Sequence, residues 1–173
     1  MSAASLVGRK PSARERLLAA ADELFYAEGV HTVGIDRVIE RAGVAKASLY
    51  STFGSKEGLV RAYLEGRHER RRAQLRAGLE RYDNPRDRLL GVFDVLAEMA
   101  ASPAYRGCAF YNASAESPEG GAVQEVSDAN RAWTRSLLVE LARDAGARRP
   151  EALADQLVLL YDGSTVGARM DRN

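Results

Sequence analysis

The sequence is poor in the residues on which secreted proteins and many metalloenzymes depend. Its 173 residues include one cysteine, Cys108, and two histidines, His31 and His68. A single cysteine cannot close an internal disulfide, and so few Cys and His residues make a transition-metal site improbable. No run approaches the roughly 20 apolar residues that cross a bilayer, and residues 1–11 lack the apolar segment of a signal peptide. We therefore expect a cytoplasmic chain without membrane segment, metal or cofactor.

Catalytic patterns are missing as well. No glycine-rich phosphate loop precedes an expected helix, and neither histidine has a plausible catalytic partner nearby in the sequence. We identify no catalytic residue and expect that the protein is not an enzyme.

The residues that are present suit a globular protein with an uneven charge. The chain is 46% hydrophobic and 28% charged, which is enough to bury a substantial core. Residues 1–72 carry 13 Lys and Arg against 9 Asp and Glu, whereas residues 73–173 carry 12 against 15. A front part with excess positive charge is the distribution expected when one domain meets a polyanion and the other does not.

Apolar residues recur at helical spacing along the whole chain, and no segment alternates as a strand does. Ser12 and Glu15 form a capping box that predicts the start of the first helix, and Gly29 predicts its end. Two short helices follow, and then a long one runs from Ser55 to about Arg81. The pattern predicts eight helices, the later four over about 85–103, 104–116, 122–145 and through 153–161.

Residues 38–59, with the sequence VIERAGVAKASLYSTFGSKEGL, carry the most specific motif. Gly43 allows a tight turn between two short helices, and Leu49 and Phe53 anchor the second of them on the first helix. This stretch closely resembles the helix-turn-helix signature of the TetR family, and the resemblance covers about residues 12–66. It implies a bacterial transcriptional regulator, most simply a repressor, that binds pseudo-palindromic operator DNA as a homodimer and is released by a small-molecule effector.

The resemblance also implies an all-α fold of two domains. A flexible basic arm over 1–11 precedes a trihelical DNA-binding domain over 12–60, and a long helix joins it to a helical ligand-binding and dimerisation domain over 61–173.

A helix placed in the major groove presents the side chains of its N-terminal half to the bases. Lys46 can contact guanine or phosphate, small residues at 47 and 48 permit close approach, and the Tyr50 hydroxyl can donate to phosphate. Lys56 adds positive charge at the start of the long helix. The predicted DNA-binding residues are Gly34, Lys46, Ala47, Ser48, Tyr50, Ser51 and Lys56.

The sequence departs from the family pattern at two expected helix caps. Gly34 stands where many relatives have Ser or Thr, and Ala45 stands where many have Ser, so both positions lack a capping hydroxyl. A second basic feature, the run from Arg70 to Arg72, lies in the middle of the long helix. We expect it to be a solvated face and not a DNA contact.

The segment 106–116 is similar to a pattern of one TetR subgroup in which this short helix lies against the ligand cavity. We expect an apolar effector. The candidate ligand-binding residues are Phe93, Leu96, Met99, Cys108, Phe110, Tyr111, Asn112, Trp133, Leu137 and Tyr161. Simple core packing is the alternative for each apolar residue, and Asn112 and Tyr111 are the better candidates because they bring polar groups to an apolar wall. Cys108 is expected to be a small buried hydrophobe, because no basic cluster near it is evident.

In the family the last two helices of two subunits form a four-helix dimer interface. Here one of these helices would be the segment that carries Leu153, Gln156, Leu157 and Leu160, with Tyr161 on the same face. We expect a further helix about where the chain stops at Asn173, so either the sequence is truncated or disordered there or this member dimerises through a smaller interface. Two alternatives stay open: a ligand-independent DNA-binding regulator whose back half only dimerises, and a helical interaction or scaffolding protein.

Overall fold

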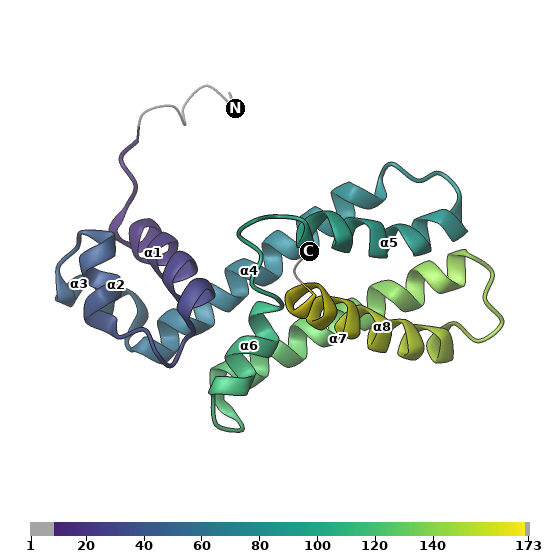
Figure 1. The fold of residues 1–173 in the computed structure, drawn as a ribbon. Helices are drawn as coiled ribbons and strands as arrows, with labels where there is room; N and C mark the ends of the chain where they lie inside the picture. Colours follow the sequence, from purple (N-terminus) through teal and green to yellow (C-terminus); the bar gives the residue numbers. More distant parts are fainter. Residues whose placement is uncertain (1–8, 172–173) are drawn as a thin grey trace. The chain divides into compact units, whose positions relative to one another are not determined.

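The computed structural model describes residues 9–171, so residues 1–8 of the expected basic arm and residues 172–173 lie outside the described part. Eight helices and no strand make up residues 9–171, as the sequence predicts (Figure 1). They are α1 (Ala13–Glu28), α2 (Ile35–Ala42), α3 (Lys46–Phe53), α4 (Lys56–Leu79), α5 (Pro85–Ala100), α6 (Ala109–Glu116), α7 (Gly121–Asp144) and α8 (Pro150–Met170).

The chain forms two compact units that meet in sequence at Tyr63 and Leu64. Helix α4 therefore begins in the first unit and ends in the second. The sequence places the boundary between residues 60 and 61. None of the helices within residues 9–171 is long and apolar enough to span a membrane.

The first unit is a trihelical cluster followed by the start of α4. The predicted capping box starts α1: the Ser12 hydroxyl accepts from the Glu15 amide at 3.2 Å, and the Ser12 amide donates to the Glu15 carboxylate at 2.7 Å. Val38 of α2 and Leu49 of α3 are fully buried, and both helices contact α1. Helices this short are only marginally stable in isolation, so their packing against α1 stabilises them.

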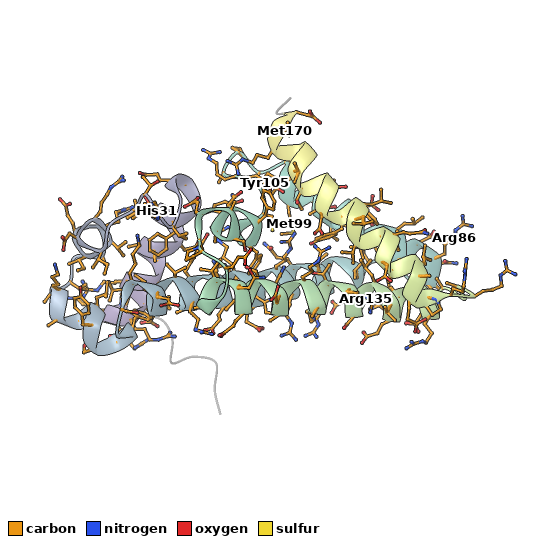
Figure 2. The ribbon with its side chains drawn as sticks, turned by 90° about the horizontal axis from the view of Figure 1, so that it is seen from below. His31, Arg86, Met99, Tyr105, Arg135 and Met170 are labelled. Carbon is orange, nitrogen blue, oxygen red and sulfur yellow. The ribbon has the colours of Figure 1, made fainter. Side chains whose placement is uncertain are left out.

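The second unit surrounds one apolar core. The core residues come from α4, α5, α7 and α8, with Leu75, Val92 and Leu138 fully buried. Met99 packs against this core, whereas Met170 at the end of α8 is 76% exposed (Figure 2). Pro85 occupies the first turn of α5, where the sequence predicts that the helix begins, and the Asn84 side chain caps it.

Candidate nucleic-acid interface and ligand cavity

Gly43 makes the turn between α2 and α3. Its φ of 60° and ψ of 46° place it in the left-handed region that glycine adopts at low cost. Arg16 of α1 donates from Nη1 to the Gly43 carbonyl at 2.8 Å and to the Ala42 carbonyl at 3.3 Å. These bonds satisfy carbonyls at the end of α2 and tie the turn to α1. This role of Arg16 is not evident from the sequence, because the bond joins residues 27 positions apart.

Helix α3 presents the predicted DNA-binding residues on one side and buries the other. Leu49 is fully buried, whereas Tyr50 is 46% exposed and Lys46, Ala47 and Ser51 are exposed. Ser48 is half-buried, and its carbonyl accepts hydrogen bonds from the Ser51 and Thr52 hydroxyls at 3.2 and 2.6 Å. The exposed side therefore offers an ammonium group and a phenol beside small side chains.

Lys46 is held by an ion pair. Its Nζ lies 2.9 Å from Oδ1 of Asp36, which belongs to the first turn of α2. This hydrogen bond, together with the charge of Asp36, raises the pKa of Lys46. Both side chains are exposed, and water screens surface pairs of this kind, so the pair adds little to stability. A DNA phosphate or guanine can therefore replace Asp36 as the partner of Lys46 at little cost.

The start of α4 is built around Gly58. The Ser55 hydroxyl accepts from the Gly58 amide at 3.0 Å, which confirms the predicted cap. A Cβ on Gly58 would lie 2.1 Å from the Phe53 carbonyl oxygen at the end of α3, so only glycine fits here. Lys56 extends from this first turn and donates from Nζ to the His31 carbonyl at 3.3 Å.

The two expected cap residues that lack a hydroxyl make no capping hydrogen bond in the structure. Gly34 precedes α2 and Ala45 precedes α3, both with extended backbone and no side-chain cap bond. We predict that Ala45→Ser raises the free energy of unfolding of the first unit by about 1 kcal/mol, because a Ser hydroxyl can accept from an amide of the first turn.

Thermal unfolding monitored by circular dichroism tests this prediction. Gly34→Ser is the matched control and should gain only a few tenths of a kcal/mol, since glycine is already a fair cap. A destabilised Ala45→Ser variant would contradict the assignment of residue 45 as the cap.

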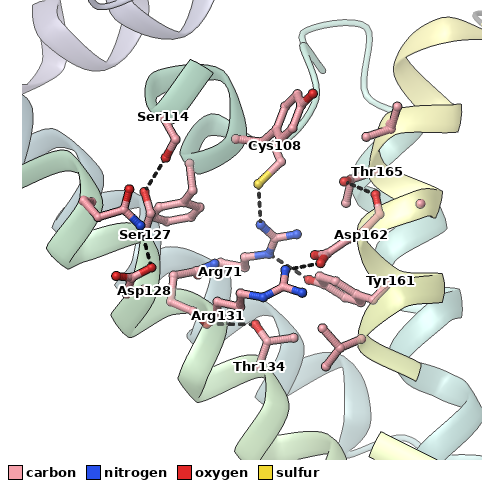
Figure 3. A pocket seen from close by; sticks show the side chains of 17 residues that line it. Arg71, Cys108, Ser114, Ser127, Asp128, Arg131, Thr134, Tyr161, Asp162 and Thr165 are labelled. Atoms are coloured by element: carbon pink, nitrogen blue, oxygen red, sulfur yellow. Dashed lines mark hydrogen bonds and ion pairs between the residues drawn. The ribbon is translucent and has the colours of Figure 1, made fainter. Parts of the chain in front are cut away.

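A cavity of about 430 Å³ opens in the second unit (Figure 3). Its walls come from α4, α6, α7, α8 and the residue before α6. The lining residues are Arg71, Cys108, Phe110, Tyr111, Ser114, Gln124, Ser127, Asp128, Asn130, Arg131, Thr134, Val158, Tyr161, Asp162, Gly163, Thr165 and Val166.

The cavity takes in only part of the predicted ligand-binding set. Cys108, Phe110, Tyr111 and Tyr161 line it. The remaining apolar candidates pack in or against the core and do not line this cavity; they are Phe93, Leu96, Met99, Trp133 and Leu137.

Asn112 has a different place from the one expected. It does not line the cavity. Its Nδ2 donates to the Arg106 carbonyl at 3.0 Å, and its Oδ1 accepts from Arg169. Many lining residues carry polar or charged groups, yet the larger part of the surface that the cavity exposes is apolar, so the apolar effector stays a prediction. Sequence reasoning missed the contributions of Asn130 and Thr134 from α7 and Thr165 from α8, all three buried.

The prediction of a solvated basic run is wrong for Arg71, which is only 9% exposed and lines the cavity. Its Nε donates to the Tyr161 hydroxyl at 2.8 Å, and its Nη1 donates to the Cys108 sulfur at 3.7 Å (Figure 3). Cys108 is half-buried and has this basic neighbour, which the sequence did not reveal. A helical period places Arg71 with Leu64, Leu75 and Leu79 on one stripe, and this spacing was the signal that marked it as inward-facing.

The predicted dimer residues on α8 are also divided. Gln156 and Leu160 are exposed, Leu153 and Leu157 are half-buried against the core, and Tyr161 is 3% exposed. Tyr161 therefore belongs to the cavity and not to the outer face. The sequence prediction missed three exposed apolar residues of this helix, Leu159, Val166 and Met170.

The fold and the exposed α3 surface define a helix-turn-helix protein with a helical second unit, and comparisons with known proteins agree. The family model described as "Bacterial regulatory proteins, tetR family" matches residues 17–63. The transcriptional activator FasR of Mycolicibacterium smegmatis is 32% identical over 151 residues, which cover 85% of this chain and 68% of FasR.

Solved structures give the same result. A TetR-family transcriptional regulator from Streptomyces coelicolor superposes with a TM-score of 0.85 at 36% identity, over 91% of this chain and 84% of that one. A regulator from Saccharomonospora viridis, solved in complex with choline, shares the fold with a TM-score of 0.76 at 18% identity, over 90% of this chain and 84% of that one. The chain belongs to the TetR family. It is therefore a transcriptional regulator and not an enzyme, as the sequence predicts.

Proposed function

We propose that the protein is a cytoplasmic homodimeric repressor that binds a pseudo-palindromic operator through α3 and the start of α4. A small molecule in the cavity of the second unit lowers its operator affinity. The observation that carries the DNA-binding part is the exposed side of α3, where Lys46 and Tyr50 flank small residues and the opposite side is fixed by buried Leu49.

The proposed base contacts come from Lys46, Ala47 and Ser48, because they lie in the first turn of α3. Tyr50, Ser51, Lys56 and the Gly34 amide are proposed to hold phosphates.

Dimerisation is proposed because one helix of this length contacts only a few base pairs. Specific binding then requires two half-sites at a fixed spacing, which a two-fold symmetric dimer supplies. The proposed contact surface is the outer side of α8, where Leu159 and Leu160 are 68% and 60% exposed. Gln156, Val166 and Met170 extend this side along the helix, and half-buried Leu153 and Leu157 border it.

Effector control is proposed because α4 contributes both to the DNA-binding surface and to the cavity. Lys56 begins this helix and Arg71 lies further along it. A ligand that moves the later turns of α4 therefore acts on the helix that carries Lys56. The choline complex of the S. viridis protein supports the idea that this fold accepts small molecules.

A titration of a labelled duplex from the protein's own promoter tests the DNA and dimer proposals together. We expect two chains per pseudo-palindromic duplex, much weaker binding to a single half-site, and an affinity that falls steeply as salt rises. Fluorescence anisotropy gives the affinity, and sedimentation gives the stoichiometry. A chain that stays monomeric at every concentration and binds the palindrome without cooperativity would overturn the dimer proposal.

A promoter-reporter assay tests the direction of regulation. Repression predicts higher reporter expression when the regulator is deleted. Lower expression after deletion would instead indicate that the protein is an activator, as the relative FasR is named. A ligand that fills the cavity without changing operator affinity would support a ligand-independent regulator instead.

A further inference from the structure

Arg71 is a buried positive charge without a negative partner. It is 9% exposed, and it donates to the neutral phenol of Tyr161 and to the sulfur of Cys108, which accepts only weakly. Among the described residues no carboxylate lies within ion-pair distance of Arg71. An arginine stays protonated at neutral pH, and a buried charge is costly unless an opposite charge accompanies it.

The carboxylates that line the cavity are already engaged near its rim. Asp162 is paired with Arg131, and both side chains are about half exposed. Asp128 is exposed and accepts a hydrogen bond from Gln124 at 2.8 Å. The buried part of the cavity wall thus carries a positive charge without a negative partner, whereas the Arg131–Asp162 charges at the rim are paired. This difference favours an anion next to Arg71.

Tyr161 provides a second donor at the same place. Its oxygen accepts from Arg71 Nε, which leaves its own hydrogen available to the cavity. Burial raises the pKa of Tyr161, so the phenol keeps this hydrogen at neutral pH. Nε of Arg71 and one Nη1 hydrogen are used by Tyr161 and Cys108, so the other Nη1 hydrogen and the Nη2 group can meet a ligand.

We infer that the effector is a monocarboxylate with an apolar body, whose carboxylate binds Arg71 and the Tyr161 hydroxyl. This inference rests on the proposed function, since it names the ligand class of the same cavity. The guanidinium fork matches carboxylate and phosphate alike, but one arginine balances the single charge of a carboxylate, whereas a phosphate monoester carries about −1.5 to −2 at pH 7. Phe110 and Val158 supply apolar wall for the rest of the molecule.

Matched acid and amide probes test the inference. Octanoate and octanamide have the same apolar chain and nearly the same shape, so their difference isolates the charge. We expect isothermal titration calorimetry at pH 7.5 to show octanoate binding at least tenfold more tightly than octanamide. Phenylacetate and phenylacetamide form a second pair with an aromatic body, and octyl phosphate tests the other anion.

Variants at neighbouring positions provide the control. Arg71→Gln should abolish the preference for the acid, and Arg71→Lys should restore part of it because the charge returns without the planar fork. Arg70→Gln removes the same charge from the exposed adjacent position and should leave the preference unchanged. If Arg71→Gln fails to fold by circular dichroism, Tyr161→Phe tests the second donor and should reduce the preference severalfold.

The possible results separate this inference from the proposed function. Equal binding of acid and amide, no binding of any acid, or a preference for octyl phosphate over both acids would overturn the inference. An amide that binds as well as its acid and lowers operator affinity would leave the proposed effector control standing. An acid that binds through Arg71 and leaves operator affinity unchanged would support a carboxylate site at Arg71 and overturn the effector control.

Discussion

The Gly58→Ala variant is expected to lose about 3 kcal/mol of stability in the first unit, at the upper end of what overpacking costs. The added Cβ would lie 2.1 Å from the Phe53 carbonyl oxygen, and this atom belongs to the backbone and cannot rotate away. Either α3 must separate from α4 or the first turn of α4 must unwind. Hydrogen exchange of the amides of α3 and early α4, together with thermal unfolding, measures the loss.

The control lies on the same helix. A Cβ on Gly66 would approach nothing closer than Nη1 of Arg70 at 3.5 Å, the end of a flexible side chain. Gly66→Ala should therefore stabilise the helix by up to about 1 kcal/mol, since alanine is the better helix former. If the two substitutions have equal effects, the close approach at Gly58 does not decide the stability of this unit.

Combining Tyr50→Phe with Lys56→Ala is expected to weaken operator binding at least about 100-fold. Each substitution removes a proposed hydrogen bond to a charged phosphate, and such bonds contribute about 1.5–3 kcal/mol. In a dimer each bond is lost at both half-sites. Anisotropy titrations at low salt with the wild type, the single variants and the double variant measure the effect.

Salt dependence distinguishes the two residues. Lys56→Ala should lower the slope of log affinity against log salt by about one for each half-site, whereas Tyr50→Phe should leave it unchanged because no charge is lost. Arg148→Ala removes the same charge from an exposed site in the second unit and should change little. If the double variant binds as the wild type does, the assignment of the DNA-binding surface is wrong.

The sequence by itself determined which segments are helical and where several helices begin or end, because these features depend on neighbouring residues; α6 begins later than predicted and α8 extends to Met170. Ser12 and Glu15 cap α1 through bonds that span three positions, and Ser55 caps α4 in the same way. Gly43 ends α2 because its own backbone angles require glycine. The buried position of Leu49 follows from its spacing in a short amphipathic helix, so the exposed side of α3 was predictable too.

Only the tertiary structure decided what the second unit holds in its cavity and on its surface. Arg71 meets Tyr161 across 90 residues of sequence. Tyr161 and Leu160 are neighbours on α8, yet one is buried and the other is 60% exposed. The helical period gives the angle between two such side chains around α8. Which of them is covered by a neighbouring helix depends on how α4, α7 and α8 pack. Helical spacing puts Arg71 on the inward side of α4, but the packing decides which groups it meets there, and the proposed ligand class depends on those groups.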